Sequence, residues 1–379
     1  MERYDVIVLG LGAMGSAALY DLARRGVRAL GIERHGVAHG FGSSHGVTRV
    51  IRKAYFEHPN YIPLLNRAYE NWTRLQEESG EPLFVPTGLL VAGPPDSAVI
   101  EGLSRCYAEH DLPHERLNAM EAMARHPQFA LPRDYAAFFD PSGGYLLAEE
   151  CIEHSLRLAE ERGAEVLLHE ETTAWKADSD GVRVFTEHGE YEAGALVVTA
   201  GPWSADALRE LNLPLSLRRK VQLWYATPDA APYSEGAMPV FYVAADYGGF
   251  YGFPARDEDG LKLAEHTGGD PLDNPDTLNR GLEPQDEEKA LRFLAETLPG
   301  FEPERRRFSV CMYTMTPDEH FIIDRHPEHP NVALAAGFSG HGFKFASVVG
   351  EILADLATEG RTDLPVDFLS LGRFRGAMR

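Results

Sequence analysis

The stretch YDVIVLGLGAMGSAALYDLARRG, Tyr4–Gly26, decides the fold of this chain. Its first residues, up to Leu9, are apolar and rich in β-branched side chains, which predicts a strand buried in a parallel sheet. A glycine-rich turn follows, and the next residues have the composition of a helix that ends at Gly26. A second apolar run, Val27–Ile32, ends at Glu33, so the whole segment is predicted to form a β–α–β unit.

The turn reads GLGAMG at residues 10–15 and matches the dinucleotide-binding motif G-x-G-x-x-G. Gly10 allows the tight turn, Gly12 lets the backbone approach a pyrophosphate, and Gly15 allows the helix to pack closely on the strand. The first turn of the helix offers free N–H groups to phosphates, and Glu33 can bind ribose hydroxyls. The motif predicts a dinucleotide site, but it is shared by FAD and NAD sites.

Composition and charge describe a globular chain. The 379 residues are 44% hydrophobic and 25% charged, which is enough sequence for two domains. The net charge of −22 argues against non-specific binding of nucleic acid, which needs patches of Lys and Arg. No apolar run approaches the ~18 residues of a membrane span, and the chain enters a strand at once instead of a signal peptide. We therefore expect a cytoplasmic protein that binds neither nucleic acid nor membrane.

Signals for buried parallel strands recur near the start, in the middle at Ala195–Thr199 and near the end at Val332–Ala336. Between them, mostly in residues 218–266, aromatic and alternating segments favour antiparallel strands. This order predicts an α/β fold in which a Rossmann-like nucleotide-binding domain is interrupted by a mostly antiparallel, α+β substrate domain. The expected boundaries are 1–85, 146–215 and 320–379 for the first domain, and 86–145 and 216–319 for the second.

A second glycine-rich turn, GFSGHGFKF at residues 337–345, precedes a predicted helix that runs to Leu356. Its amides would converge at the start of that helix, where the helix dipole favours negative charge such as that on a reduced flavin. Taken alone, the glycines are better explained by an ordinary strand-to-helix turn. The turn therefore supports a flavin site only in combination with other motifs.

Four polar residues have more than one interpretation. Cys311, one of three widely spaced cysteines that suggest neither a disulfide framework nor a zinc site, is a small buried hydrophobe, a nucleophile or a point of cofactor attachment. Arg49 and Arg52, if their segment is helical, share a face that either binds an anion or is solvated. Lys262 lies among apolar residues, where burial is costly unless the side chain has a partner or a function.

Two other chemistries find little support. The histidines of DEH at 318–320 and HPEH at 326–329 lack the spacing of HExxH, so no metal is expected. The hydrolase motif GxSxG is absent, and GFSGHG resembles it only superficially, because the second residue after Ser339 is His341.

Together, these motifs resemble the family of monomeric sarcosine oxidases and N-methyltryptophan oxidases, which are flavoprotein amine oxidases. The resemblance covers essentially the whole chain. Besides GLGAMG, the segments that carry it are GSSHGVTRVIRKAY (42–55), GFYGFP (249–254), GLKLAEH (260–266), CMYTMTPDEHFIID (311–324) and GFSGHGFKFASVVGEI (337–352). It implies a monomer that converts an N-methyl amino acid, oxygen and water to an amino acid, formaldehyde and hydrogen peroxide.

The resemblance also implies the cofactor and its attachment. FAD would lie between the two domains, joined by a thioether between Cys311 and the flavin 8α-methyl group. The pyrimidine edge of the flavin would contact a group of residues from two segments: Thr314, Gly340, His341, Gly342, Phe343 and Lys344.

The substrate and oxygen sides follow from the same resemblance. Arg52 and Lys344 would hold the substrate carboxylate, which suits a planar fork and a point charge. Lys262 would lie across the flavin near Arg49, where a fixed ammonium can stabilise superoxide. The substrate side would be lined by Tyr251, His266 and Tyr313.

One segment departs from the family. Familiar members carry SHHGDTR where this chain has SSHGVTR, with Ser44 and Val47 in place of a His and an Asp. Both positions are expected beside the FAD and the substrate access, so bulkier secondary amino acids are expected to be oxidised relatively better.

Three other functions stay open at this point. The first is an oxidase of N-methyltryptophan or cyclic imino acids, which the motifs barely separate from a sarcosine oxidase. The second is an NAD-linked dehydrogenase. The third is a flavoprotein subunit that passes electrons to a partner, against which stand the presence of Lys262 and the absence of iron–sulfur spacing.

Overall fold

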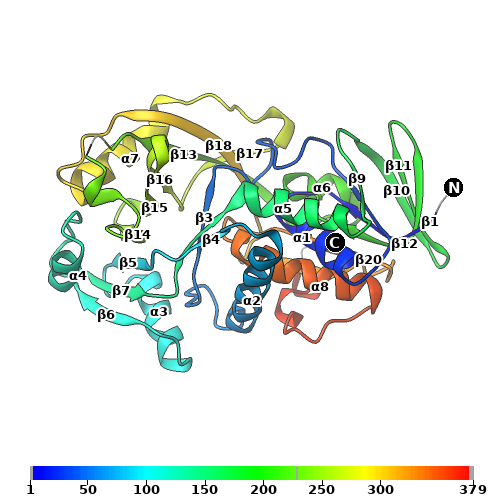
Figure 1. Cartoon of the computed structure of the whole chain (residues 1–379), viewed down its shortest axis with the longest axis horizontal. Coiled ribbons are helices and arrows are strands. Elements are labelled where there is room, and N and C mark those ends of the chain that lie inside the picture. Colours follow the sequence, from blue (N-terminus) through cyan, green and yellow to red (C-terminus); the bar gives the residue numbers. More distant parts are fainter. Residues whose placement is uncertain (1–2, 228, 375–379) are drawn as a thin grey trace.

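Two large β-sheets dominate the computed structural model, which describes residues 3–227 and 229–374 (Figure 1). The eight-stranded sheet pairs β1 in parallel with β2 and β12, β2 with β9, and β12 with β20. Its strands are β1 (Arg3–Leu9), β2 (Ala29–Ile32), β9 (Glu165–Leu167), β10 (Thr172–Asp178), β11 (Gly181–Thr186), β12 (Glu190–Val198), β19 (Ile322–Arg325) and β20 (Val332–Ala336). The predicted α/β class is confirmed.

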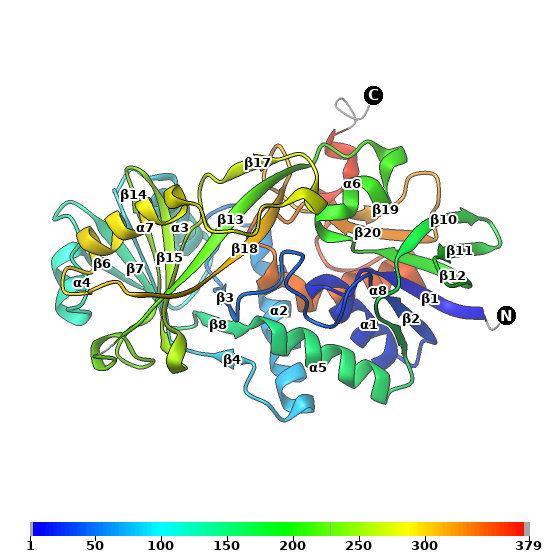
Figure 2. The ribbon, with the colours of Figure 1, turned by 90° about the horizontal axis from the view of Figure 1, so that it is seen from above.

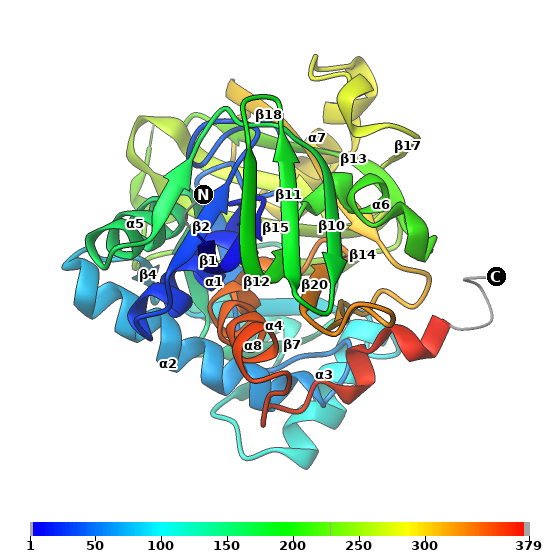
Figure 3. The ribbon, with the colours of Figure 1, turned by 90° about the vertical axis from the view of Figure 1, so that its right-hand side faces the viewer.

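Strand β12 joins the two parts of this sheet. Its residues 190–193 pair antiparallel with β11, and its residues 196–198 pair parallel with β20. The predicted buried strand at Ala195–Thr199 is therefore the second half of a longer strand, whose first half pairs with β11. The hairpin of β10 and β11 extends the sheet on the side away from β2 (Figure 3).

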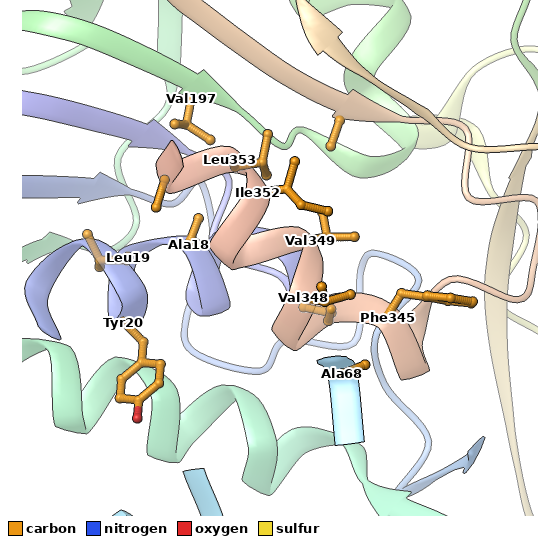
Figure 4. Close-up of a cluster of buried hydrophobic side chains, with 14 of the residues drawn as sticks. Ala18, Leu19, Tyr20, Ala68, Val197, Phe345, Val348, Val349, Ile352 and Leu353 are labelled. Carbon is orange, nitrogen blue, oxygen red and sulfur yellow. The ribbon is translucent and has the colours of Figure 1, made fainter. Parts of the chain in front are cut away.

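Three helices pack against the eight-stranded sheet, α1 (Ala13–Arg24), α5 (Ala148–Glu161) and α8 (Ala346–Thr358), and α2 (Tyr61–Ser79) packs on α5 and α8. Ala18 and Leu19 of α1 and Val349 and Ile352 of α8 are fully buried in the core that these helices share (Figure 4). Burial of each such aliphatic side chain contributes ~1.5–3 kcal/mol. This core fixes the start of α1 and the start of α8, which are the two helix ends that face the site described below.

Gly15 marks the closest approach of α1 to the preceding strand. A Cβ atom built on Gly15 would lie 1.8 Å from the carbonyl oxygen of Gly10. The glycine at this position is therefore required by packing, which is the role that the sequence motif assigns to it.

We expect the substitution Gly15→Ala to lower the free energy of unfolding by about 1–3 kcal/mol, the usual cost of overpacking. Urea denaturation measures this change. Gly300→Ala is the matched control, because a Cβ built on Gly300 meets no atom within 4 Å. Equal stability of the two variants would contradict the packing role of Gly15.

The nine-stranded sheet is mostly antiparallel, with one parallel pairing between β5 and β14. Its strands are β5 (Leu89–Gly93), β6 (Glu115–Asn118), β7 (Ala136–Asp140), β13 (Ser216–Tyr225), β14 (Val240–Ala245), β15 (Gly248–Arg256), β16 (Gly260–Glu265), β17 (Asp270–Leu272) and β18 (Arg305–Met315). Figure 2 shows β13 and β18 running side by side from this sheet toward the eight-stranded one. The helices beside it are α3 (Ala98–Glu109), α4 (Ala119–Arg125) and α7 (Pro284–Thr297).

A small third sheet, formed by β3 (Thr48–Ile51), β4 (Phe84–Val85) and β8 (Gly144–Leu147), connects the two parts of the molecule. The helical interpretation of the segment with Arg49 and Arg52 is wrong, because β3 pairs antiparallel with β8. Among residues 3–227 and 229–374, no helix is long and apolar enough to cross a bilayer.

The predicted domain boundaries stay a proposal, which sheet membership supports. The strands of the eight-stranded sheet fall in 1–85, 146–215 and 320–379, and those of the nine-stranded sheet fall in 86–145 and 216–319.

Candidate active site

A cavity of about 1120 Å³ is lined by residues from both large sheets. It brings together segments that are far apart in the sequence. The predicted site residues in its wall are Gly10, Gly12, Glu33, Arg49, Arg52, Tyr251, His266, Cys311, Tyr313, Thr314, Gly340, His341, Gly342, Phe343 and Lys344. Gly15 and Lys262 are outside the wall, since Gly15 packs on Gly10 and Lys262 is buried behind the segment 46–48.

One end of the cavity suits a dinucleotide. Gly10 and Gly12 form the turn between β1 and α1, and Glu33 follows β2 at the same edge of the sheet. The Glu33 carboxylate accepts hydrogen bonds from the backbone N–H groups of Leu11 (2.8 Å) and His35 (2.9 Å). Burial alone would raise the pKa of Glu33, but His39 and these two N–H groups outweigh burial and lower it. Glu33 is therefore an anion that also braces the glycine turn.

The other end suits the flat ring of a flavin. Gly340 has φ +79°, and a Cβ built on it would lie 2.2 Å from the ring of Tyr313, so the turn leaves no room for a side chain there. The hydroxyl of Thr314 is buried in the cavity wall without a partner among the described residues. The helical residues Phe343–Phe345 and α8 then start from this turn and direct their first N–H groups toward it. An orphaned hydroxyl and a helix N-terminus fit a ring edge that becomes negative on reduction.

Arg52 already holds a carboxylate. Its guanidinium donates to both oxygens of Glu57 (2.7 and 2.8 Å) and to the backbone carbonyl of Ala54 (2.6 Å). Burial would lower the pKa of Arg52, but Glu57 outweighs burial and raises it. Arg52 is therefore a permanent cation in the cavity wall, and its guanidinium can bind a carboxylate.

Lys344 supplies a second cation close to Arg52. Its Nζ atom donates to the backbone carbonyl of His341 (2.6 Å), and the side chain is buried. Burial, followed by repulsion from Arg52, lowers the pKa of Lys344 to about 7. Its ammonium form is therefore partly populated near neutral pH, and a bound anion would favour it.

The substrate side of the cavity is aromatic and neutral. Burial, followed by repulsion from His341, lowers the pKa of His266 to about 3, so the imidazole carries no charge near neutral pH. His266 Nδ1 lies 3.4 Å from the Tyr313 hydroxyl. Burial also raises the pKa of Tyr251 and of Tyr313, so both stay protonated. This wall can orient a neutral amine but contains no strong base.

Lys262 and Arg49 meet at the backbone carbonyl of Thr48, to which both donate at 2.9 Å. Lys262 Nζ also donates to the carbonyl of Gly46 (2.6 Å) and lies over the rings of Trp224 and Phe253. Burial, followed by repulsion from Arg49, holds the pKa of Lys262 well below its ordinary value. The partner that its burial requires is therefore a cluster of oxygen atoms from the segment 46–48.

Cys311 lies on β18 with its thiol in the cavity wall, directly opposite Lys220 of β13. Burial lowers the pKa of Lys220 to about 8. Gln222 Nε2 approaches the Cys311 Sγ atom at 3.5 Å. No cluster of three or more His, Cys, Asp or Glu side chains that could hold a metal occurs in the described part of the chain.

Sequence reasoning missed three polar residues of this region: Glu57, Tyr242 and Gln222. Gln222 is buried in β13. Its position inside the apolar run KVQLWY could have indicated a buried polar side chain that needs hydrogen-bond partners. Tyr242 on β14 lines the cavity beside His266, with ring centroids 6.1 Å apart. Glu57 lies in an irregular segment and had no sequence signal.

The structure places Ser44 in the cavity wall, as expected, but Val47 outside it. The Ser44 hydroxyl accepts from the N–H of Ala13 (3.3 Å), which places it at the nucleotide end of the cavity. Val47 lies outside the cavity wall, and its N–H donates to the Glu149 carboxylate (2.9 Å). Its φ of +67° is unfavourable for a β-branched residue, so the Glu149 contact holds the backbone there. Neither position is therefore expected to select substrates by size.

Comparisons with known proteins agree with this geometry. Residues 5–356 match the family model described as FAD dependent oxidoreductase. The chain is 43% identical to a monomeric sarcosine oxidase of Bacillus sp. (strain B-0618), over 98% of this chain and 96% of that protein. It is 39% identical to the N-methyl-L-tryptophan oxidase of Escherichia coli O157:H7, over 98% of this chain and 100% of that protein. The solved structure of NikD, an amino acid oxidase of nikkomycin biosynthesis, superposes with a TM-score of 0.85 at 27% identity, covering 98% of each chain.

Proposed function

This chain belongs to the FAD dependent oxidoreductase family, alongside the sarcosine and N-methyltryptophan oxidases, and from that membership we propose that it oxidatively demethylates N-methyl amino acids. The proposed reaction converts sarcosine, oxygen and water to glycine, formaldehyde and hydrogen peroxide. The observation that carries it is the placement of two cations, Arg52 and Lys344, in the same cavity as the nucleotide turn and Cys311.

FAD, when bound, supplies the acceptor for the hydride equivalent that leaves the N-methyl carbon. Gly10, Gly12 and Glu33 would hold its nucleotide half, and Thr314 with the turn 340–344 would hold its ring. We propose that Cys311 attaches the ring covalently. This assignment is supported by the position of the thiol in the wall of the same cavity.

The side chains of the substrate pocket orient the amine. A carboxylate that binds Arg52 would replace Glu57 at the guanidinium, and Lys344 would add its charge from the neighbouring turn. Fixing the carboxylate fixes the N-methyl group, which is the proximity contribution to catalysis. The neutral wall of Tyr251, His266 and Tyr313 favours the neutral amine, which is the form that can give up a hydride.

The proposal is tested with purified protein, sarcosine and an oxygen electrode. Formaldehyde and hydrogen peroxide should form in a 1:1 ratio with the oxygen consumed. Reduction of the flavin by sarcosine under nitrogen, without oxygen uptake in air, would instead indicate a dehydrogenase that needs another electron acceptor.

Lys344→Met should weaken binding of methoxyacetate, which has an ether oxygen in place of the sarcosine amine, by about 10–150-fold, the effect of losing one charge-assisted partner. In the unsubstituted protein, the affinity should fall as pH rises through about 7, because Lys344 loses its proton there. In Lys344→Met, that pH dependence should disappear. Absorbance titration of the bound flavin measures both effects.

The matched control is Lys53→Met, which removes a nearby cation that lies over the Tyr69 ring and not in the cavity wall. It should leave the methoxyacetate affinity unchanged. An equal loss in both variants would show that general charge, and not a clamp, attracts the ligand.

A second candidate substrate class is supported by the composition of the wall. Beyond Arg52, the cavity is lined by Phe56, Leu89, Val91 and Tyr242, which offer apolar contact to a side chain larger than hydrogen. N-methyl amino acids with aliphatic or aromatic side chains are therefore the second candidates. Comparison of kcat/KM for sarcosine and N-methyl-leucine decides between the two.

A further inference from the structure

We propose that Gln222 is the positioning residue for thioether formation at Cys311. The proposal rests on the proposed attachment of the flavin to this cysteine. Its basis is one buried amide that contacts the sulfur on one side and both His45 and Arg49 on the other.

Gln222 and Cys311 lie on the same face of two paired strands. In the antiparallel pairing of β13 with β18, Gln222 is opposite Ser309 and Lys220 is opposite Cys311. Residues directly opposite, and residues two apart along a strand, point to the same side of a sheet. Gln222 is therefore the diagonal neighbour of Cys311, and its Nε2 atom lies 3.5 Å from the sulfur.

The Gln222 amide has a fixed orientation. Its Nε2 group also donates to the carbonyl of His45 (3.3 Å), and its Oε1 atom accepts from Nη1 of Arg49 (3.4 Å). Because Arg49 can only donate, the amide oxygen must face Arg49 and the amide nitrogen must face the sulfur. Gly46 leaves the space for this arrangement, since a Cβ built there would lie 2.3 Å from the Gln222 Oε1 atom.

The hydrogen-bond donor acts on the form of Cys311 that reacts. Thioether formation breaks the S–H bond and one C–H bond of the 8α-methyl group and forms the C–S bond. The two protons and two electrons released reduce oxygen to hydrogen peroxide. The attacking species is the thiolate, and a donated N–H stabilises an anion more than a neutral thiol. Gln222 therefore both holds the Cys311 sulfur in position and favours its thiolate form.

Charged and titratable groups also lie around the sulfur. Gln222 differs from them because, among the described residues, it is the group that donates a hydrogen bond to the sulfur. These groups are Lys220, Lys262, Arg280, Tyr251 and Tyr313, and Arg49 contacts the Gln222 amide.

The test uses the FAD-free full-length chain reconstituted with FAD. Gln222→Met keeps the length of the side chain and removes the N–H group. We expect it to slow the appearance of acid-stable flavin about 10–100-fold. Alkylation of Cys311 by iodoacetamide in the FAD-free chain, followed by peptide mass spectrometry, should slow in parallel. Raising the pH should restore the alkylation rate toward that of the unsubstituted chain, because the thiolate then forms without the Gln222 N–H group. The rate of flavin attachment should recover only in part, because the sulfur is no longer held in position.

Ser309→Ala is the control, since Ser309 is on the same face but its hydroxyl contacts His45 Nδ1 (3.0 Å) and not the sulfur. It should alkylate and attach flavin at the unsubstituted rate. Attachment in Gln222→Met at the unsubstituted rate overturns the proposal. An alkylation rate that stays low at all pH values also overturns it, because that outcome indicates a packing defect. Loss of flavin from the unsubstituted protein on acid precipitation would overturn the proposed attachment itself, whereas the alkylation result would still decide the role of Gln222.

Discussion

Cys311→Ser should bind FAD but release all of it on acid precipitation, leaving a colourless pellet. A serine hydroxyl is about the size of the thiol, but it is a far weaker nucleophile near neutral pH because its anion is scarcely populated. The noncovalent contacts at Gly10, Gly12, Glu33 and the turn 340–344 are untouched by the change. The soluble variant should therefore still be yellow before acid is added, and absorbance of the pellet and supernatant measures the difference.

Cys106→Ser is the matched control, since Cys106 is also buried but is in α3, outside the cavity wall. Its flavin should stay with the acid-precipitated protein. If the pellet of Cys311→Ser stays yellow, another residue is the point of attachment and the thiol has a different role.

The nucleotide half of the site could be predicted from the sequence because its interactions are local. GLGAMG, the flanking strands and Glu33 lie within a single β–α–β unit, and the close contact that requires Gly15 is made within that unit. The structure bears this out at Gly15, where the predicted close packing is a distance of 1.8 Å from a built Cβ to the Gly10 carbonyl oxygen.

The partners of the charged residues could not be predicted, because they come from distant strands and irregular segments. The spacing of Arg49 and Arg52 would place them on one face of a helix, but Arg49 is in β3, which is held as a strand by pairing with β8, about a hundred residues further along. The contact of Gln222 with Cys311 depends on the register of β13 against β18, which a single sequence does not fix. The backbone conformation of Val47 could not be predicted either, because the contact with Glu149 sets it and not the conformational preference of valine.

Lys262→Met should slow the reoxidation of reduced flavin by oxygen about 10²–10³-fold, the usual cost of removing one preorganised electrostatic donor. Anaerobic reduction by sarcosine should stay near the unsubstituted rate, since Lys262 is outside the cavity wall that orients the amine. The oxygen effect of Lys262 should weaken as pH rises, because burial holds its pKa below the ordinary value and the ammonium is lost at lower pH than usual. Stopped-flow absorbance measures the two half-reactions separately.

Two further variants separate charge from structure. Lys289→Met removes an exposed lysine that pairs with Glu265, so it lowers the net positive charge without touching the Thr48 cluster, and its reoxidation rate should be unchanged. Thr48→Val removes one hydroxyl acceptor of Lys262 (3.2 Å) but keeps the carbonyl and the charge, so it should have a smaller effect than Lys262→Met. If Lys262→Met slows the anaerobic reduction instead of the reoxidation, the lysine serves the substrate, and the oxygen site must lie elsewhere. The buried ammonium of Lys262 donates to three oxygen atoms of the segment 46–48, and the carbonyl of Thr48 also accepts from Arg49 in the cavity wall. A role in oxygen chemistry therefore requires that the charge of Lys262 acts across this segment on the part of the cavity beside Arg49.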